Sequence, residues 1–171
     1  MNQTIVLTII ANDQPGIVQK VSSVLHDHGG SWSESSMSHL AGRFAGILMA
    51  QLPERNVDPC KSALSALEAE GIQIIAKVGQ DVGDEPSHAW RIELVGNDRP
   101  GIVNDITAVL AAHGVSVHTL ETGVEGASMG GGSLFRAWAR LVVPESCDVE
   151  ELGQALEDLA NDLMVDMNFE T

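Results

Sequence analysis

The chain contains two copies of one segment, and they align without a gap. Residues 11–31 read ANDQPGIVQKVSSVLHDHGGS, and residues 96–116 read GNDRPGIVNDITAVLAAHGVS. The motif Asn-Asp-x-Pro-Gly-Ile-Val is intact in both copies, and Val-Leu, His-Gly and Ser recur in register after it. A repeat of this length predicts two copies of one structural unit. Each unit would have only a modest core, so we expect the units to dock together or the chain to dimerise.

The same elements are predicted in both copies. Alternation of apolar and charged residues indicates a strand over 88–95. The strand predicted over 3–10 is apolar on both faces, which is typical of a strand covered on both sides. Pro15 and Pro100 fit the first position of the helix that follows, whose apolar residues recur at helical spacing. Gly29 and Gly114 fit the position just after each helix, where a left-handed backbone is favoured.

Further strands and helices complete each copy. In the first copy, two strands are predicted over 31–39 and 44–52, a helix over 58–70 and a closing strand over 72–78. In the second copy, two strands are predicted over 115–123 and 133–143 and a closing strand over 164–169. The second helix of this copy is predicted to begin near 148, where Asp148 and Glu151 fit a capping box. This β-α-β-β-α-β order is the ferredoxin-like unit. We therefore expect an α+β protein with two antiparallel four-stranded sheets, each with both helices on one face. The predicted domains are 1–79 and 88–171, with 80–87 as a linker. The inner strand 44–52 is apolar on both sides, so we expect the other face of its sheet to be covered.

The charge excludes some partners. The formal net charge is −15, and the nine basic residues form no run in the sequence. Nucleic-acid binding depends on Lys and Arg that neutralise phosphates, and a strongly negative protein repels polyanions. We therefore expect no direct nucleic-acid partner and no anionic membrane partner.

The residue types that serve metals and catalysis are scattered. Cys60 and Cys147 form no C-x-x-C pattern, and the six histidines have no zinc-ligand spacing. No nucleophile, base and orienting group can be assembled, so we expect no enzyme activity, metal or cofactor. Two cysteines near predicted helix starts could have lowered pKa values, although ordinary thiols are the simpler interpretation. Free thiols and the absence of a basic, apolar leader indicate a cytoplasmic protein.

The conserved turn within this order of elements resembles the ACT domain family. ACT domains are small regulatory modules that commonly bind amino acids at interfaces between paired copies. Two copies with little else, the segment 155–166 and the stretch 128–135 resemble one group in particular, the glycine cleavage system transcriptional repressors. That group is thought to act through a separate DNA-binding activator. The resemblance implies a small amino acid as ligand, glycine among the possibilities, a protein partner such as a transcriptional activator, and either a homodimer or pairing of the two modules within one chain.

The turn has the chemistry to bind a zwitterion. A helix start presents unpaired N–H groups and the positive end of the helix dipole to a carboxylate, and a glycine there permits close approach. Asp13 and Asp98 could pair with the ligand ammonium. The candidate ligand-binding residues are Asn12, Asp13, Pro15, Gly16 and Ile17, with Asn97, Asp98, Pro100, Gly101 and Ile102. A purely structural interpretation, in which the motif only makes a good strand-to-helix turn, is equally open.

Three functions follow from this interpretation. The first is a co-regulator of the glycine cleavage system that acts on a transcription factor, and the second is an allosteric subunit of an amino-acid metabolic enzyme. A catalyst is the third and is disfavoured. Some serine-binding ACT domains have Asn before x-Pro-Gly and His two residues earlier, where this chain has Asp13 or Asp98 and Ala11 or Gly96. This departure argues against serine-type recognition. The run 130–132 fits a flexible hairpin better than a phosphate loop.

Overall fold

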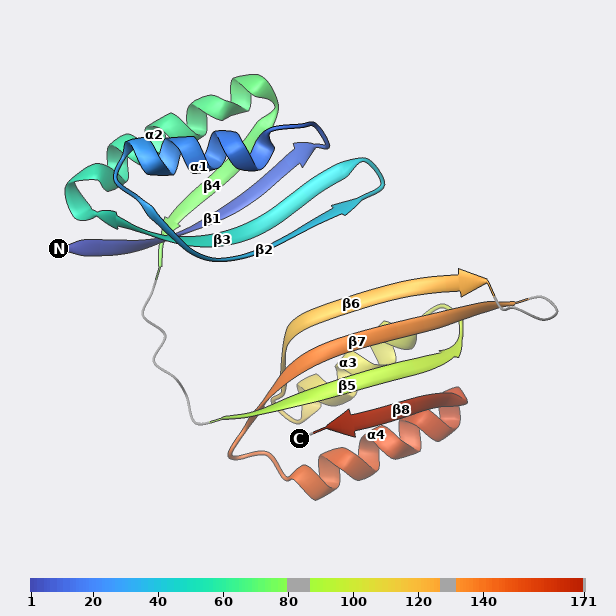
Figure 1. The fold of residues 1–171 in the computed structure, drawn as a ribbon. Coiled ribbons are helices and arrows are strands. Elements are labelled where there is room, and N and C mark those ends of the chain that lie inside the picture. Colours follow the sequence, from blue (N-terminus) through green and yellow to red (C-terminus); the bar gives the residue numbers. More distant parts are fainter. Residues whose placement is uncertain (80–86, 127–131, 171) are drawn as a thin grey trace. The chain divides into compact units, whose positions relative to one another are not determined.

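The chain forms two compact units, Met1–Asp81 and Val82–Thr171. The computed structural model describes residues 1–79, 87–126 and 132–170. Each unit is a four-stranded antiparallel sheet with both of its helices on one face (Figure 1). The expected ferredoxin-like architecture is therefore confirmed in both halves. Most of the predicted linker lies outside the described residues, and its last residue, Ser87, opens a strand.

The first unit has the strand order β2-β3-β1-β4. Its elements are β1 (Asn2–Asn12), α1 (Ile17–Asp27), β2 (Ser31–Leu40), β3 (Arg43–Pro53), the short 3-10 turn η1 (Glu54–Asn56), α2 (Val57–Ala66), a second 3-10 turn η2 (Leu67–Glu70) and β4 (Ile72–Val78). The second unit has the order β6-β7-β5-β8. Its elements are β5 (Ser87–Asn97), α3 (Ile102–Ala112), β6 (Ser116–Gly126), β7 (Ser133–Pro144), α4 (Val149–Leu163) and β8 (Val165–Glu170).

Each core lies between a sheet and its two helices. Every second residue of β1 points toward the helices and is buried, and α1 contributes three residues spaced by four, which share one helical face. The buried residues are Ile5, Leu7, Ile9 and Ala11 of β1, and Ile17, Val21 and Leu25 of α1. The second unit repeats this arrangement with Ile92 and Leu94 of β5 and Ile102, Ile106 and Leu110 of α3.

The helix ends largely follow the sequence. Gly29 and Gly114 have φ of 71° and 72°, which confirms them as the left-handed residues that end α1 and α3. Asp148 caps α4, because its Oδ1 accepts hydrogen bonds from the N–H groups of Glu150 and Glu151 at 3.0 Å. Met164 was predicted to open the closing strand, but it has φ of 53° and ends α4 instead.

The starts of α1 and α3 differ from the prediction. Pro15 and Pro100 do not occupy the first helical position, because the helices begin two residues later, at Ile17 and Ile102. Pro15 and Gly16 form a turn before α1. Gly16 has φ 90° and ψ 3°, the dihedral angles of the third residue of a type II turn, whose second residue is often proline. The proline therefore sets the turn before the helix.

Candidate ligand-binding corners

The repeated motif forms a corner between a strand and a helix in each unit. Asn12 and Asn97 are the last residues of β1 and β5. The N–H of Asp13 donates to the carbonyl of Gly42 at 3.0 Å, and the N–H of Asp98 donates to the carbonyl of Ser133 at 2.8 Å. Each corner is thereby held against the hairpin formed by the two following strands.

The glycines at the corners are required by their backbone conformation. Gly16 and Gly101 have φ of 90° and 96°, a region that costs other residues about 1–2 kcal/mol. A Cβ built on Gly16 would meet no atom within 4 Å, so the space beside this glycine is open. A bulky residue at Gly16 would therefore change both the approach to the helix start and the turn itself, and it is a poor test of ligand binding.

The isoleucines of the motif have a structural role. Ile17 and Ile102 are only 3% and 2% exposed, and their side chains belong to the two cores. Only their backbone N–H groups can face a ligand. The remaining candidates are exposed at the surface: Asn12, Asp13, Pro15, Gly16, Asn97, Asp98, Pro100 and Gly101.

Polar side chains surround the first corner. His39 Nε2 lies 3.4 Å from Asp13 Oδ2, and the guanidinium of Arg43 donates to the side-chain oxygen of Asn12. Both partners come from the β2–β3 hairpin. The ammonium of Lys20, in the first turns of α1, pairs with Glu70. Two cationic side chains therefore belong to this corner: Arg43, bonded to Asn12, and Lys20, whose charge is paired with Glu70.

The second corner has a different charge at its helix start. Asp105 occupies the position of the repeat that Lys20 holds in the first unit. One oxygen of its carboxylate lies 3.8 Å from where a Cβ of Gly101 would be. Arg99 Nη2 lies 3.4 Å from the same oxygen. This helix start therefore already has an internal carboxylate in the first turn, where an anion is favoured.

A shallow depression lies beside the first corner. Its volume is about 300 Å³, and it is lined by Ile10, Ala11, Asn12, Arg43, Glu68, Gly71 and Gln73. It includes Asn12 and leaves 13–17 outside its lining. Asn12 and Arg43 therefore both line the depression. The start of α1, at Ile17, follows Asn12 closely in the sequence.

Sequence reasoning missed the side chains that distinguish the corners. His39 and Arg43 come from the hairpin, and their proximity to the motif depends on the pairing of β1 with β3. Lys20 and Asp105 were visible in the aligned repeats as a change of charge within an otherwise similar segment. That change of charge was the signal by which the sequence could have distinguished the two corners.

The cysteines do not have the lowered pKa values that their positions suggested. Burial raises the pKa of the Cys60 thiol. The pKa of Cys147 is raised by burial and by the neighbouring carboxylates of Asp148 and Glu151. Both thiols are therefore less acidic than an ordinary cysteine, which favours the interpretation as ordinary thiols over activated ones.

The described residues contain neither a metal-binding cluster nor a membrane-spanning helix. In residues 1–79, 87–126 and 132–170, no group of three or more His, Cys, Asp or Glu could hold a metal ion. Over the same ranges, every helix is too short or too polar to cross a membrane. The glycine run 130–132 falls mostly outside the described residues.

Comparison with known proteins matches both halves of the chain. Two family models, each described as an ACT domain, match residues 3–77 and 90–163. The UPF0237 protein MK1213 of Methanopyrus kandleri is 32% identical over 78 residues, which cover 46% of this chain and 77% of that protein.

Two solved structures resemble the whole chain. An unknown protein from Galdieria sulphuraria has a TM-score of 0.89 and 29% identity, and the match covers 99% of this chain and 98% of that one. A protein assigned as a glycine cleavage system transcriptional repressor has a TM-score of 0.68 and 18% identity, with 99% and 97% covered. At that identity, the second likeness shows the fold alone.

Proposed function

Because this chain belongs to the ACT domain family, with two such domains in tandem, we propose that it senses a small amino acid and regulates a protein partner in the cytoplasm. The observation that carries the proposal is the open start of α1 beside Gly16, with Arg43 and the Lys20–Glu70 ion pair at the same corner. An amino acid carries a carboxylate and an ammonium on neighbouring carbons. The corner offers complementary groups for both.

The ligand carboxylate would bind at the start of α1. The backbone N–H groups at Gly16 and Ile17 and the helix dipole favour an anion there, and the ammonium of Lys20 would exchange Glu70 for the ligand carboxylate. The ligand ammonium would bind Asp13, whose carboxylate is half-exposed beside His39. Asn12 and Pro15 would shape the approach. The exposed position of this corner leaves room for a second ACT domain to complete the site.

The second corner is the weaker candidate for an anionic group. Its residues Asn97, Asp98, Pro100, Gly101 and Ile102 repeat the motif. However, a ligand carboxylate would approach the carboxylate of Asp105, and like charges repel. We therefore propose that one amino acid binds per chain, in the first unit.

The regulated process is proposed to be transcription of glycine cleavage genes. Support comes from the full-length likeness to a protein assigned as a glycine cleavage system transcriptional repressor. The net charge of −15 argues against direct DNA binding, so a DNA-binding activator would be the partner and glycine a natural first ligand to test. An allosteric subunit of an amino-acid metabolic enzyme is the second candidate, because the tandem ACT architecture alone fits that role equally well.

Ligand binding is tested by exchanging the charges that distinguish the corners. The full chain is screened by thermal shift and calorimetry against the twenty common amino acids. We expect one bound molecule per chain for the best ligand. Lys20→Asp gives the first corner the charge of the second and should weaken binding by about tenfold or more, or 1.4 kcal/mol. Asp105→Lys should instead create a second, weaker site.

The matched control for these variants is Lys61→Asp, which makes the same charge change on α2 of the first unit. It should leave the affinity unchanged. The proposal for the corner would be wrong if an amino acid binds and Lys20→Asp retains its full affinity. If none of the twenty stabilises the chain, sensing of a common amino acid is itself wrong.

The choice of partner is tested with DNA. The chain alone should not shift a promoter fragment of glycine cleavage genes in a gel. It should alter the mobility of the complex when the corresponding activator is added, and the ligand should change that effect. Specific co-purification with a metabolic enzyme, and no effect on the activator complex, would favour the allosteric subunit.

A further inference from the structure

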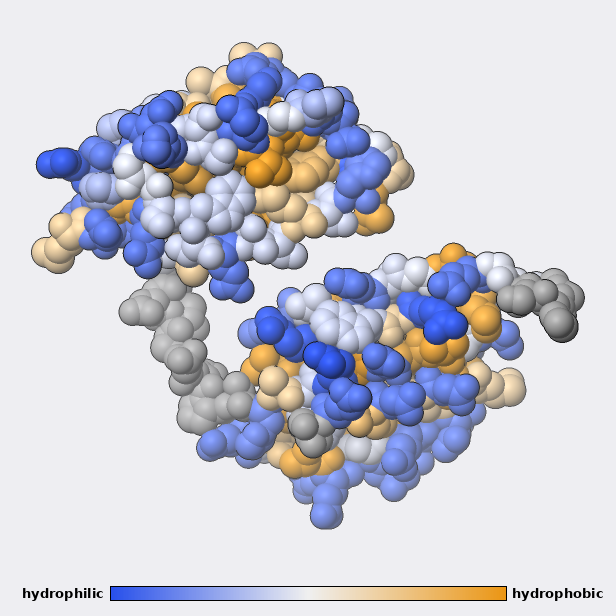
Figure 2. All heavy atoms as spheres, viewed as in Figure 1, coloured by the Kyte–Doolittle hydropathy of each residue, from blue (hydrophilic) through white to orange (hydrophobic). Residues whose placement is uncertain are grey.

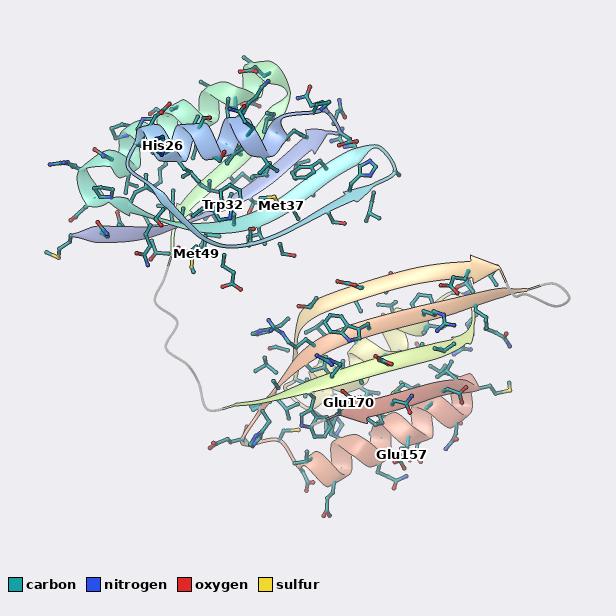
Figure 3. All side chains as sticks on the ribbon, in the orientation of Figure 1. His26, Trp32, Met37, Met49, Glu157 and Glu170 are labelled. Carbon is teal, nitrogen blue, oxygen red and sulfur yellow. The ribbon has the colours of Figure 1, made fainter. Side chains whose placement is uncertain are left out.

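The open face of the first sheet, opposite the helices, has an apolar middle, and the polar residues on this face lie mostly on its edge strands β2 and β4. Here "open face" means Val6, Thr8 and Ile10 of β1 with the residues of β2, β3 and β4 that are in register with them. Ile10, Ile47 and Ile75 are 40%, 51% and 59% exposed, and Val6 and Met49 are half-buried. Figure 3 shows Met49 on this side of the sheet, whereas Trp32 and Met37 lie on the helix side. The first unit therefore supplies no cover for this face.

The second unit provides an internal comparison, because three of the five apolar positions of the first sheet are charged or polar in its sheet, while Val95 and Trp138 stand at the positions of Ile10 and Ile47. Arg91 stands where the first unit has Val6, Arg140 replaces Met49, and Asn168 replaces Ile75. This face is turned to the viewer in Figure 2 and is largely hydrophilic. Arg91, Arg136 and Arg140 do share this face, unlike the scatter seen in the sequence, but carboxylates lie among them. Of the two open faces, that of the first sheet has the more exposed apolar side chains among the described residues, and such a surface marks an interface.

Two opposite charges lie at the edges of the apolar face. The strand registers place Glu34, Met49, Val6 and Lys77 in one row across β2, β3, β1 and β4. Glu34 is thus at one edge of the sheet and Lys77 at the other, at the same height along the strands. Neither has an ion-pair partner among the residues that the structure describes.

This arrangement is complementary to itself. Consider a second copy whose open face packs on the first, related by a twofold axis that runs along the strands between β3 and β1. Each edge strand then lies over the opposite edge strand of the other copy. Lys77 of one copy faces Glu34 of the other, and the reverse pair forms by symmetry. A twofold axis in the plane of the interface and perpendicular to the strands would instead place Glu34 opposite Glu34 and Lys77 opposite Lys77.

The neighbouring row fits the same axis. Ser36, Ile47, Thr8 and Ile75 are in register across the sheet. A depression of about 270 Å³, lined by Val6, Glu34, Ser35, Ser36, Ile47, Leu48 and Met49, lies on the β2 side. The exposed Ile75 of the second copy would be placed over Ser36 and could enter this depression.

From these observations we propose that the open face of the first sheet is a dimer interface, in which two copies pack sheet against sheet with reciprocal Lys77–Glu34 contacts. Four strands spaced by about 4.8 Å and some eight residues long give an area of roughly 500 Å² per copy. Two such faces would bury about 1,000 Å² in total, which is at the low end for a specific interface, so we expect a weak dimer. The proposal does not depend on the ligand-binding corner.

Charge reversal tests this dimer in the full chain. The dimer dissociation constant is measured by analytical ultracentrifugation. Glu34→Lys and Lys77→Glu should each weaken the dimer by about tenfold or more, because each creates two like-charge oppositions. The double variant exchanges the charges and should restore the dissociation constant to within about threefold of the original. Thr119→Lys, at the position of Glu34 in the second sheet, is the control and should have no effect.

Disulfide trapping gives a second measurement that does not depend on the affinity. In a Cys147→Ser background, Ser36→Cys and Ile75→Cys chains are mixed under mild oxidation. The geometry predicts a mixed covalent dimer and little of either homodimer. A monomer at all concentrations, a dimer indifferent to the reversals, or trapping of Ser36→Cys with itself would overturn the proposal, since the face would then be covered by something else or in another orientation.

Discussion

Gly96→Ala is expected to destabilise the second unit by about 2–3 kcal/mol, at the upper end for an overpacked core. A Cβ on Gly96 would lie 2.3 Å from Cγ1 and 2.9 Å from Cβ of Val165, and Gly96 is paired with Val165 across β5 and β8. The clash involves atoms close to the backbone, so β8 itself must move. Urea unfolding followed by Trp90 and Trp138 fluorescence reports on this unit, whereas Trp32 reports on the other.

The first unit supplies the reason that this effect is local. It has Ala11 in place of Gly96, buried at 2% exposure and paired with Ile72. The fold therefore accepts a Cβ at this position when the neighbouring strand is placed for it. Gly96→Ala combined with Val165→Ala should recover most of the stability lost in the single variant, as a double-mutant cycle. A neutral single variant would contradict the clash and show that β8 shifts at little cost.

The element order could be predicted from sequence because it depends on local signals. Gly29 and Gly114 have the left-handed backbone that their positions after an apolar helical face predicted. The helical spacing of the apolar residues Ile17, Val18, Val21, Val24 and Leu25 predicted the buried face of α1. Ile17, Val21 and Leu25 are buried, whereas Val18 lies at the margin of that face and is 45% exposed. The second half repeats the same signals, so each element could be assigned separately in both halves. The shared topology followed from the order of the elements.

The helix start was misjudged because two turn types use the same residues. Pro-Gly fits the first turn of a helix, and it also fits the centre of a type II turn. The choice between them depends on where Asp13 is held, and that is set by its hydrogen bond to Gly42 in a hairpin distant in sequence. Sequence identified the corner and its ligand-binding candidates, but it could not place Pro15 and Gly16 in a turn before the helix.

The contrast between the open faces was also beyond the sequence pattern. Apolar residues on both sides of β3 indicated that the sheet would be covered. Which charges flank that face depends on the register of four strands, and the bulge between Trp32 and Glu34 shifts β2 relative to β3. Glu34 and Lys77 therefore come into one row only when all three pairings are known.

Leu156→Ala is expected to destabilise the second unit by about 3–4 kcal/mol, as for large cavities left by buried leucines. Leu156 on α4 is 0% exposed and packs in the second core. A domain of this size has a total stability of about 4–12 kcal/mol, so much of it would be lost. Leu64→Ala, at the corresponding buried site on α2, should have a similar effect on the first unit.

The same pair of variants separates the two corners as ligand sites. The unfolding transition seen by Trp32 should remain near its original midpoint in Leu156→Ala, and the amino-acid ligand should still stabilise that transition, because the proposed site lies at the start of α1. In Leu64→Ala the first-unit transition should occur at a lower midpoint, and the ligand should still raise that midpoint, because stabilisation by a ligand depends on its concentration and dissociation constant. Loss of the ligand effect in Leu156→Ala would mean that the intact second unit contributes to the site, and binding by the first corner alone would be wrong.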